Sequence, residues 1–113
     1  MIDRNRLVNT FCELVKIDSP SGEEEEAAVD AMRRLKLLDL NVCRDDYGNV
    51  IASDDGRDPL LMSAHLDTVE PGKGIKPQIN QDHITSDGTT ILGGDCKAGV
   101  AAILEALEAL KED

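Results

Sequence analysis

Residues 60–67 of the chain read LLMSAHLD, and this stretch decides the predicted fold. A continuous apolar run ends abruptly at His65, and Asp67 follows two positions later. Short apolar runs without alternation are typical of a strand that is buried on both faces of a sheet. We therefore expect a buried strand that begins at Leu60, directly after Pro59, and ends at His65.

The segments before this strand predict two helices. Apolar residues recur at helical spacing between Asp3 and Lys16, which indicates a first helix over that range. Ser21 stands three positions before Glu24, as in a capping box. We expect this pair to open a second helix that continues through Leu35.

Further strands are predicted before and after the strand at residues 60–65, and a helix is predicted at the end of the chain. Residues 41–46 and 49–53 flank a Tyr-Gly pair, which is typical of two antiparallel strands joined by a tight turn. Weaker strand patterns occupy residues 76–80 and 83–86, and residues 97–113 have the apolar spacing of a helix. The order of elements predicts an α/β fold, with a mixed β-sheet flanked by helices.

The composition excludes several classes of partner. The chain has 113 residues and a net charge of −11, which argues against nucleic acid and anionic membranes as partners. No apolar run approaches the ~18 residues of a membrane-spanning helix, and the amphipathic N-terminal pattern is unlike a signal peptide. The three cysteines lack CxxC spacing and favour a reducing compartment. We expect a cytoplasmic protein.

His65 and Asp67 form a candidate pair for metal chemistry. If the strand continues to Asp67, the two side chains share one face. One imidazole nitrogen could then bind a metal while the other donates to the carboxylate. Taken by itself, the pair favours an ordinary polar turn, because this spacing is common by chance. His83, the only other histidine, is interpreted as an ordinary turn or strand residue.

Asp95 is a second candidate. It follows Gly93 and Gly94 and precedes the last predicted helix, where a carboxylate is electrostatically favoured. An N-cap role would explain it without any ligand. A phosphate-binding loop is excluded, because Cys96 occupies the position before Lys97 at which that motif requires glycine.

Taken together, the motifs resemble a known family. The stretches HLDTVEPGKGIKP (residues 65–77) and SDGTTILGGDCKAGVAAILEAL (residues 86–107) closely resemble the peptidase T-like branch of the di-zinc exopeptidases. Relatives of glutamate carboxypeptidases and the succinyl-diaminopimelate desuccinylase are in the same family. IDSPSGEE (residues 17–24) and DDYGNVIA (residues 45–52) match the pattern in the same order, so the resemblance spans nearly the whole chain.

The resemblance implies a role for each matched residue. His65 corresponds to a zinc ligand, Asp95 to the carboxylate that bridges two zinc ions, and Asp67 to the catalytic aspartate that orients the histidine. Cobalt or manganese could occupy the same ligands. The resemblance also implies a cis peptide bond between Asp95 and Cys96. Cys96 departs from the pattern, which usually has a second aspartate there.

The pattern also implies residues that do not follow Asp95 in this sequence. A Glu-Glu pair that supplies the general base, a further Asp and a late His are absent, as is the smaller dimerisation domain. Three glutamates of the last predicted helix have the spacing of exposed surface rather than of a relocated base: Glu105, Glu108 and Glu112.

Residues 1–113 are accordingly interpreted as the N-terminal part of a metallopeptidase catalytic domain. The expected function is zinc-dependent hydrolysis of short peptides by an aminopeptidase or tripeptidase, with this chain carrying part of the site and inactive alone. Self-association is expected through surfaces that the remaining elements would cover. The alternatives are a truncated, non-catalytic paralogue that acts as a binding or interaction module, and an acidic structural domain without a metal.

Overall fold

The computed structural model describes residues 1–54 and 60–113 and combines helices with short strands. Within these residues the helices are α1 (Arg4–Val15), α2 (Glu25–Leu37) and α3 (Gly94–Glu112). The strands are β1 (Asn41–Arg44), β2 (Val50–Ser53), β3 (Gln78–Ile79) and β4 (Ile84–Thr85). The predicted α/β class is confirmed.

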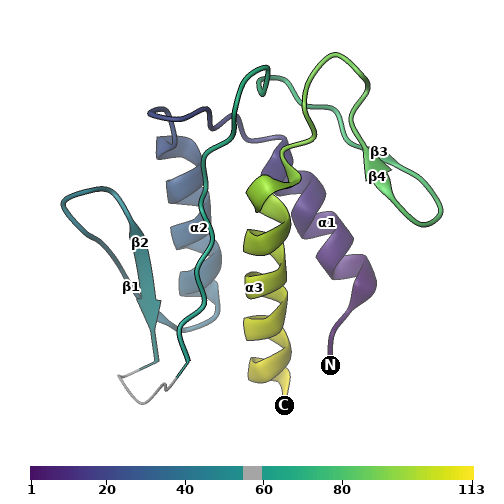
Figure 1. Cartoon of the computed structure of the whole chain (residues 1–113). Helices are drawn as coiled ribbons and strands as arrows, with labels where there is room; N and C mark the ends of the chain where they lie inside the picture. The colour runs from purple at the N-terminus through teal and green to yellow at the C-terminus, as the bar shows by residue number, and fades with distance from the viewer. Residues whose placement is uncertain (55–59) are drawn as a thin grey trace.

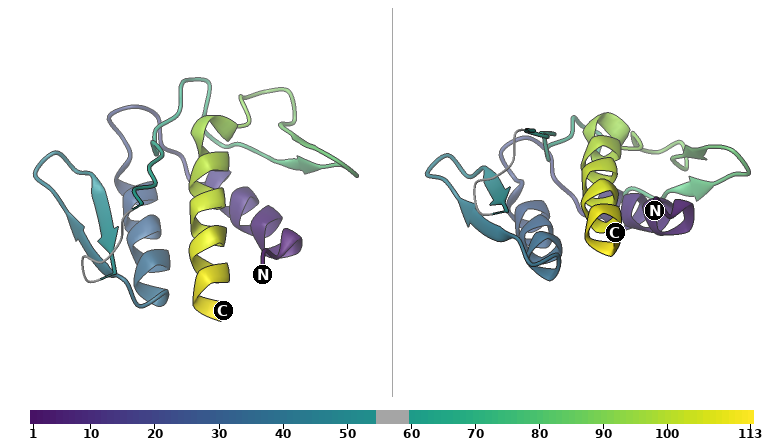
Figure 2. Two further views of the ribbon diagram at one scale, coloured as in Figure 1. Left: turned by 60° about the horizontal axis from the view of Figure 1, so that its bottom comes forward. Right: turned by 90° about the horizontal axis from the view of Figure 1, so that it is seen from below.

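The elements are arranged in a row (Figure 1). The β1–β2 hairpin packs against α2 at one end, α3 and α1 pack together, and the β3–β4 hairpin lies beyond α1. Figure 2 shows the row as a flat layer, and the molecule measures 43 × 35 × 20 Å. None of the helices in the described residues is long and apolar enough to cross a membrane.

The first predicted helix is confirmed to within one residue at each end. The carboxylate of Asp3 accepts a hydrogen bond from the backbone N–H of Arg6 at 3.0 Å and caps α1. The apolar face of α1 turns inward, where Leu14 and Val15 are buried. The N-terminal stretch is thereby fixed against α3.

The predicted capping box is wrong. Helix α2 begins at Glu25, and its N-cap residue Glu24 makes no side-chain capping bond. The hydroxyl of Ser21 instead donates to the carboxylate of Asp67, which is 46 positions away. The Ser21 hydroxyl therefore makes a tertiary hydrogen bond instead of the local helix cap that the sequence pattern predicts.

The predicted hairpin is present, and the two weaker strand patterns form a second one. Strands β1 and β2 pair antiparallel, with Arg44 opposite Val50, and the carboxylate of Asp45 accepts bonds from the N–H groups of Tyr47 and Asn49 in the turn. Strands β3 and β4 also pair antiparallel but are only two residues long each. The described strands thus form two separate two-stranded sheets rather than one mixed sheet.

The predicted buried strand from Leu60 to His65 is not formed. This segment is extended and runs between α2 and α3 (Figure 1) without a strand beside it; Pro59 lies outside the described residues. Leu60 and Leu61 are 71% and 89% exposed. The apolar run predicts burial on both faces, but within the described residues no second strand covers it.

The core lies between α1 and α3. Its buried members come from both helices and from the loop at Ile75: Phe11, Cys12, Leu14, Val15, Ile75, Val100, Ala101 and Leu104. Ala64 and Leu66 pack against this cluster from the extended segment. Because side chains alternate along extended backbone, His65 points away from the core.

The expectation that Glu105 is exposed is wrong. Its carboxylate is buried, accepts hydrogen bonds from Arg6 at 2.7 and 2.8 Å, and also accepts the backbone N–H of Asp3 at 2.8 Å. A salt bridge between α1 and α3 therefore replaces the expected surface position. Glu112 is half-exposed and also bonds Arg6.

Candidate metal centre

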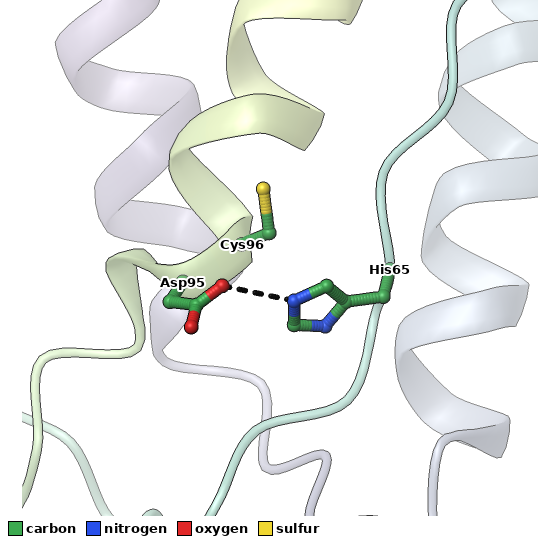
Figure 3. Close-up of side chains that lie close together, drawn as sticks. All are labelled: His65, Asp95 and Cys96. Atoms are coloured by element: carbon green, nitrogen blue, oxygen red, sulfur yellow. Dashed lines mark hydrogen bonds and ion pairs between the residues drawn. The ribbon is translucent and has the colours of Figure 1, made fainter.

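The extended segment and the start of α3 bring His65 and Asp95 together (Figure 3). The Nε2 atom of His65 lies 3.0 Å from Oδ1 of Asp95, across 30 positions of sequence. The His65 side chain is about half exposed (49%) and that of Asp95 is almost fully exposed (96%). Two residues that the resemblance assigns to one metal centre therefore lie side by side, although no sheet edge in the described residues carries them.

Asp67 fixes the tautomer of His65. The Nδ1 atom of His65 lies 2.9 Å from the backbone oxygen of Asp67 and 3.1 Å from its Oδ1. A backbone carbonyl oxygen and an ionised carboxylate can only accept, so Nδ1 carries the hydrogen. Neutral His65 then presents the lone pair of Nε2 to the carboxylate of Asp95.

Two acceptors facing each other at 3.0 Å need a cation between them. A proton can serve: the hydrogen bond with Asp95 is the main reason why the pKa of His65 is raised above its ordinary value. A divalent metal is the other candidate, because neutral imidazole nitrogen and carboxylate oxygen are both common zinc ligands. The positions of Nε2 and Oδ1 are thus compatible with a shared proton or with a bound divalent metal.

The loop at residues 17–21 supports the histidine side of the site. Ser21 donates its hydroxyl to Asp67, and this bond is the largest cause that lowers the pKa of Asp67. The backbone N–H of Thr68 donates to the carbonyl of Ser19 at 2.8 Å, and the Ser19 hydroxyl donates to the carbonyl of Leu66. The local sequence pattern assigns Ser21 to a helix cap and gives no sign of these contacts.

The same loop supports the Asp95 side. Lys97, on the first turn of α3, is 1% exposed and donates from Nζ to the carbonyl of Ile17 at 2.6 Å. Burial lowers the pKa of this lysine. One loop therefore anchors both segments that carry the facing side chains.

Asp95 does not cap its helix. The N-cap of α3 is Gly93, at a φ of 86° that favours glycine, and no side chain makes a capping bond there. Asp95 and Cys96 themselves have non-helical φ and ψ, so the regular part of α3 begins after them, and the Asp95 carboxylate contacts His65 rather than a backbone N–H. The peptide bond between Asp95 and Cys96 is cis, as the resemblance implies.

Cys96 joins the group. Ligand atoms of His65, Asp95 and Cys96 all lie within 4.8 Å of one another, and among the described residues this is the only such group of three. An imidazole nitrogen, a carboxylate oxygen and a sulfur form a donor set that suits zinc. His83, by contrast, contacts Asp82 beside the β3–β4 hairpin and belongs to no such group.

The comparisons with known proteins agree with the motifs. No model of a known protein family matches the chain. An uncharacterized protein of Bacillus subtilis is 40% identical over 124 residues; the match covers all of this chain and 33% of that protein. The chain thus spans about a third of the length of this relative.

Two solved structures share the fold. A tripeptidase from Staphylococcus aureus superposes with a TM-score of 0.90 at 39% identity, over 99% of this chain and 33% of its own. Aminopeptidase PepT from Bacillus cereus gives 0.91 at 43% identity, over 98% of this chain and 33% of its own. The peptidase T-like resemblance is confirmed, and the fold matches the N-terminal part of these structures.

Proposed function

We propose that residues 1–113 are the N-terminal part of the catalytic domain of a metal-dependent exopeptidase, an aminopeptidase or tripeptidase that acts on short peptides. The relatives support a hydrolase of the peptidase class. The observation that carries the proposal is the 3.0 Å approach of His65 Nε2 to Asp95 Oδ1. A proton on Nε2 satisfies this contact, and a divalent metal held by the same two atoms would replace that proton.

Each residue has one task in this proposal. His65 and Asp95 are metal ligands, and Asp95 has a second carboxylate oxygen that could reach another ion. Asp67 holds the imidazole in the tautomer that leaves Nε2 free, which is a common role for a carboxylate beside a metal-binding histidine. Ser21 holds Asp67 in turn.

Zinc is the proposed metal, with two ions in the complete site and with cobalt or manganese as substitutes. When bound, such ions supply Lewis-acid polarisation of a peptide carbonyl and activation of water. The openness of the site fits this chemistry, since Asp95 is 96% exposed and can be reached by ion and substrate.

The proposed partners follow from charge and surface. A net charge of −11 opposes binding to nucleic acid or to an anionic membrane. The cysteines Cys12, Cys43 and Cys96 are free thiols, which supports a reducing cytoplasm. Self-association through exposed apolar surface is also proposed.

Zinc binding to the 113-residue chain tests the metal centre. Equilibrium dialysis compares the unmodified chain with His65→Ala and with His83→Ala, which removes the only other histidine. We expect binding to be lost with His65→Ala and kept with His83→Ala. Binding that survives His65→Ala unchanged would overturn the proposal.

Hydrolysis is tested on the protein at its native length, since the chain spans about a third of its relatives. The native product is identified by its intact mass and assayed with tripeptides before and after chelation. We expect activity that chelation removes and zinc or cobalt restores. A native protein that binds zinc through His65 but cleaves no peptide would support the non-catalytic binding module instead.

A further inference from the structure

We infer that Val69 determines specificity: its side chain contacts a side chain of the peptide substrate and favours an apolar one. The inference rests on the proposed function and deepens it, because it names the class of side chain that the site should accept. Its evidence comes from the loop at residues 69–74, which lies outside the metal centre.

Val69 faces the same side of its segment as two residues of the candidate site. Every second residue of the stretch 64–68 faces the core, and Thr68, the last of these, is 2% exposed. Side chains alternate between the two sides of extended backbone, so His65, Asp67 and Val69 share the outer side. Val69 is 70% exposed there.

Val69 also lies near the start of α3. A Cβ atom at Gly93 would be 3.6 Å from Cγ2 of Thr68, so Thr68 packs against the backbone two positions before Asp95. Figure 1 shows the loop at residues 69–74 at the same end of the molecule as the start of α3. An extended tripeptide is about 10 Å long, so a peptide held at the metal centre could reach Val69.

Neighbouring loops anchor the loop at residues 69–74 on both sides. The backbone N–H of Gly74 donates to the carboxylate of Asp18 at 2.9 Å. The carbonyl of Pro71 accepts the backbone N–H of Ile91, also at 2.9 Å. These bonds hold the backbone that carries Val69.

Gly72 allows the chain to pass close behind Val69. A Cβ atom at Gly72 would lie 2.5 Å from the carbonyl oxygen of Val69 and 2.8 Å from the hydroxyl of Thr68, so any larger residue would force the turn apart. The N–H of Gly72 donates to the carboxylate of Glu70 at 2.8 Å. The turn therefore fixes the position from which the valine projects.

The chemistry of Val69 indicates an apolar partner. Single exposed apolar residues are common and need no explanation by themselves, but Val69 is on an anchored loop beside the candidate site, where residues that select substrates are often found. Its methyl groups offer no hydrogen bond, so a charged substrate side chain would lose water there without compensation. Lys73, in the same loop, lies 3.7 Å from Glu23 instead.

The experiment measures kcat/KM of the native-length protein with zinc for tripeptides that carry either leucine or lysine at one position. The first and the last position are varied separately. We expect the unmodified protein to favour leucine over lysine at one of them. Val69→Asp should lower that leucine-to-lysine ratio at least about tenfold, the size of effect that a small change of apolar contact typically has on selectivity.

Milder substitutions and a distant control complete the set. Val69→Ile should keep the ratio, and Val69→Ser should lower it without adding a charge; Val69→Ser decides the matter if Val69→Asp does not fold. Ile79→Asp makes the same change at an apolar side chain of β3 that is 63% exposed. Its ratio should equal that of the unmodified protein. Zinc affinity, measured by calorimetry, should be unchanged in all four variants.

The outcomes separate this inference from the proposed function. Hydrolysis with the same leucine-to-lysine ratio in the unmodified protein, Val69→Asp and Val69→Ser, at both peptide positions, would overturn the inference and leave the proposed function standing. Equal changes of the ratio in Val69→Asp and Ile79→Asp would also overturn it, because the effect would then be one of overall charge. Absence of peptide hydrolysis by the native-length protein would overturn both.

Discussion

The hydroxyl of Ser21 donates a hydrogen bond to Asp67, which lies 46 positions away in the sequence. Asp67 in turn approaches His65 Nδ1 at 3.1 Å, and His65 Nε2 approaches Asp95 at 3.0 Å. Four side chains from three segments thus form one hydrogen-bonded row. Ser21 and Asp67 set the orientation of His65, the proposed ligand, so substitutions at Asp67 should change the affinity for the metal.

Replacing Asp67 with Asn is expected to weaken zinc binding by about 10–100-fold, the usual loss when a partner of a metal-binding histidine is removed. The backbone oxygen of Asp67, 2.9 Å from Nδ1, keeps one acceptor in place, so binding should not vanish. Ser21→Ala should have a smaller effect in the same direction. Isothermal titration calorimetry with Zn²⁺ measures both.

The matched control is Asp82→Asn. Asp82 also contacts a histidine through its carboxylate, 2.6 Å from His83 Nδ1, but lies outside the candidate site. Its replacement should leave zinc affinity unchanged. Equal losses in the Asp67 and Asp82 variants would show that the effect is one of overall charge and not of orientation.

The sequence predicted the local elements well and the long-range contacts poorly. Helix α1 and the β1–β2 hairpin follow from apolar spacing and turn residues that lie within a few positions of each other. The roles of Ser21 and Glu105 were misjudged because each is fixed by a distant partner, Asp67 and Arg6. Propensity arguments cannot anticipate such partners.

In the candidate site, too, some residues could be predicted from the sequence and others could not. His65, Asp67 and Asp95 were predicted because they stand in motifs that the resemblance aligns. Cys96 was interpreted only as a departure from the pattern, although its position beside Asp95 places a sulfur near His65. The signal available in the sequence was the chemistry of the residue, since cysteine is itself a metal ligand.

The salt bridge between Arg6 and Glu105 predicts acid sensitivity. Hydrogen bonds from Arg6, and after them the backbone N–H of Asp3, lower the pKa of Glu105 from 4.5 to about 2. Between these values the unfolded chain binds more protons than the folded chain, so this contribution to stability is complete above about pH 4.5 and falls as the pH drops toward about 2. Urea unfolding from pH 6 downward measures the loss.

Glu105→Gln should be less stable at pH 6 and lose less stability on acidification, because it lacks the titrating carboxylate. Glu108→Gln is the control, since the Glu108 carboxylate is more exposed (38%) and 3.7 Å from Arg6. Its acid dependence should resemble that of the unmodified chain. Parallel curves for the unmodified chain and Glu105→Gln would contradict the assignment.

The extended segment at residues 60–66 predicts self-association. None of its backbone amides donates a hydrogen bond to another described residue, and Leu60 and Leu61 are 71% and 89% exposed. Unpaired extended backbone with apolar side chains recruits other chains. Light scattering over a range of concentrations should show the average mass rising with concentration.

Leu61→Lys should suppress that rise by placing a charge on the segment. Leu110→Lys provides the comparison, because Leu110 is 68% exposed and belongs to another element, α3. Its average mass should still rise. A monomer at every concentration in the unmodified chain would remove the prediction.

The last prediction is that the 113-residue chain alone does not cleave tripeptides at a measurable rate, even with excess zinc. Among the described residues the only group of potential ligands is His65, Asp95 and Cys96, enough for one ion but not for two. A two-metal hydrolysis uses both ions to stabilise the reacting oxygens. The group also contains no glutamate to act as general base, a role that typically contributes ~10²–10⁴-fold. The measurement is tripeptide hydrolysis by the purified chain with zinc or cobalt, beside His65→Ala. Activity that His65→Ala abolishes would show that a second copy of the chain, or a residue of the described structure not recognised as a base, completes the site.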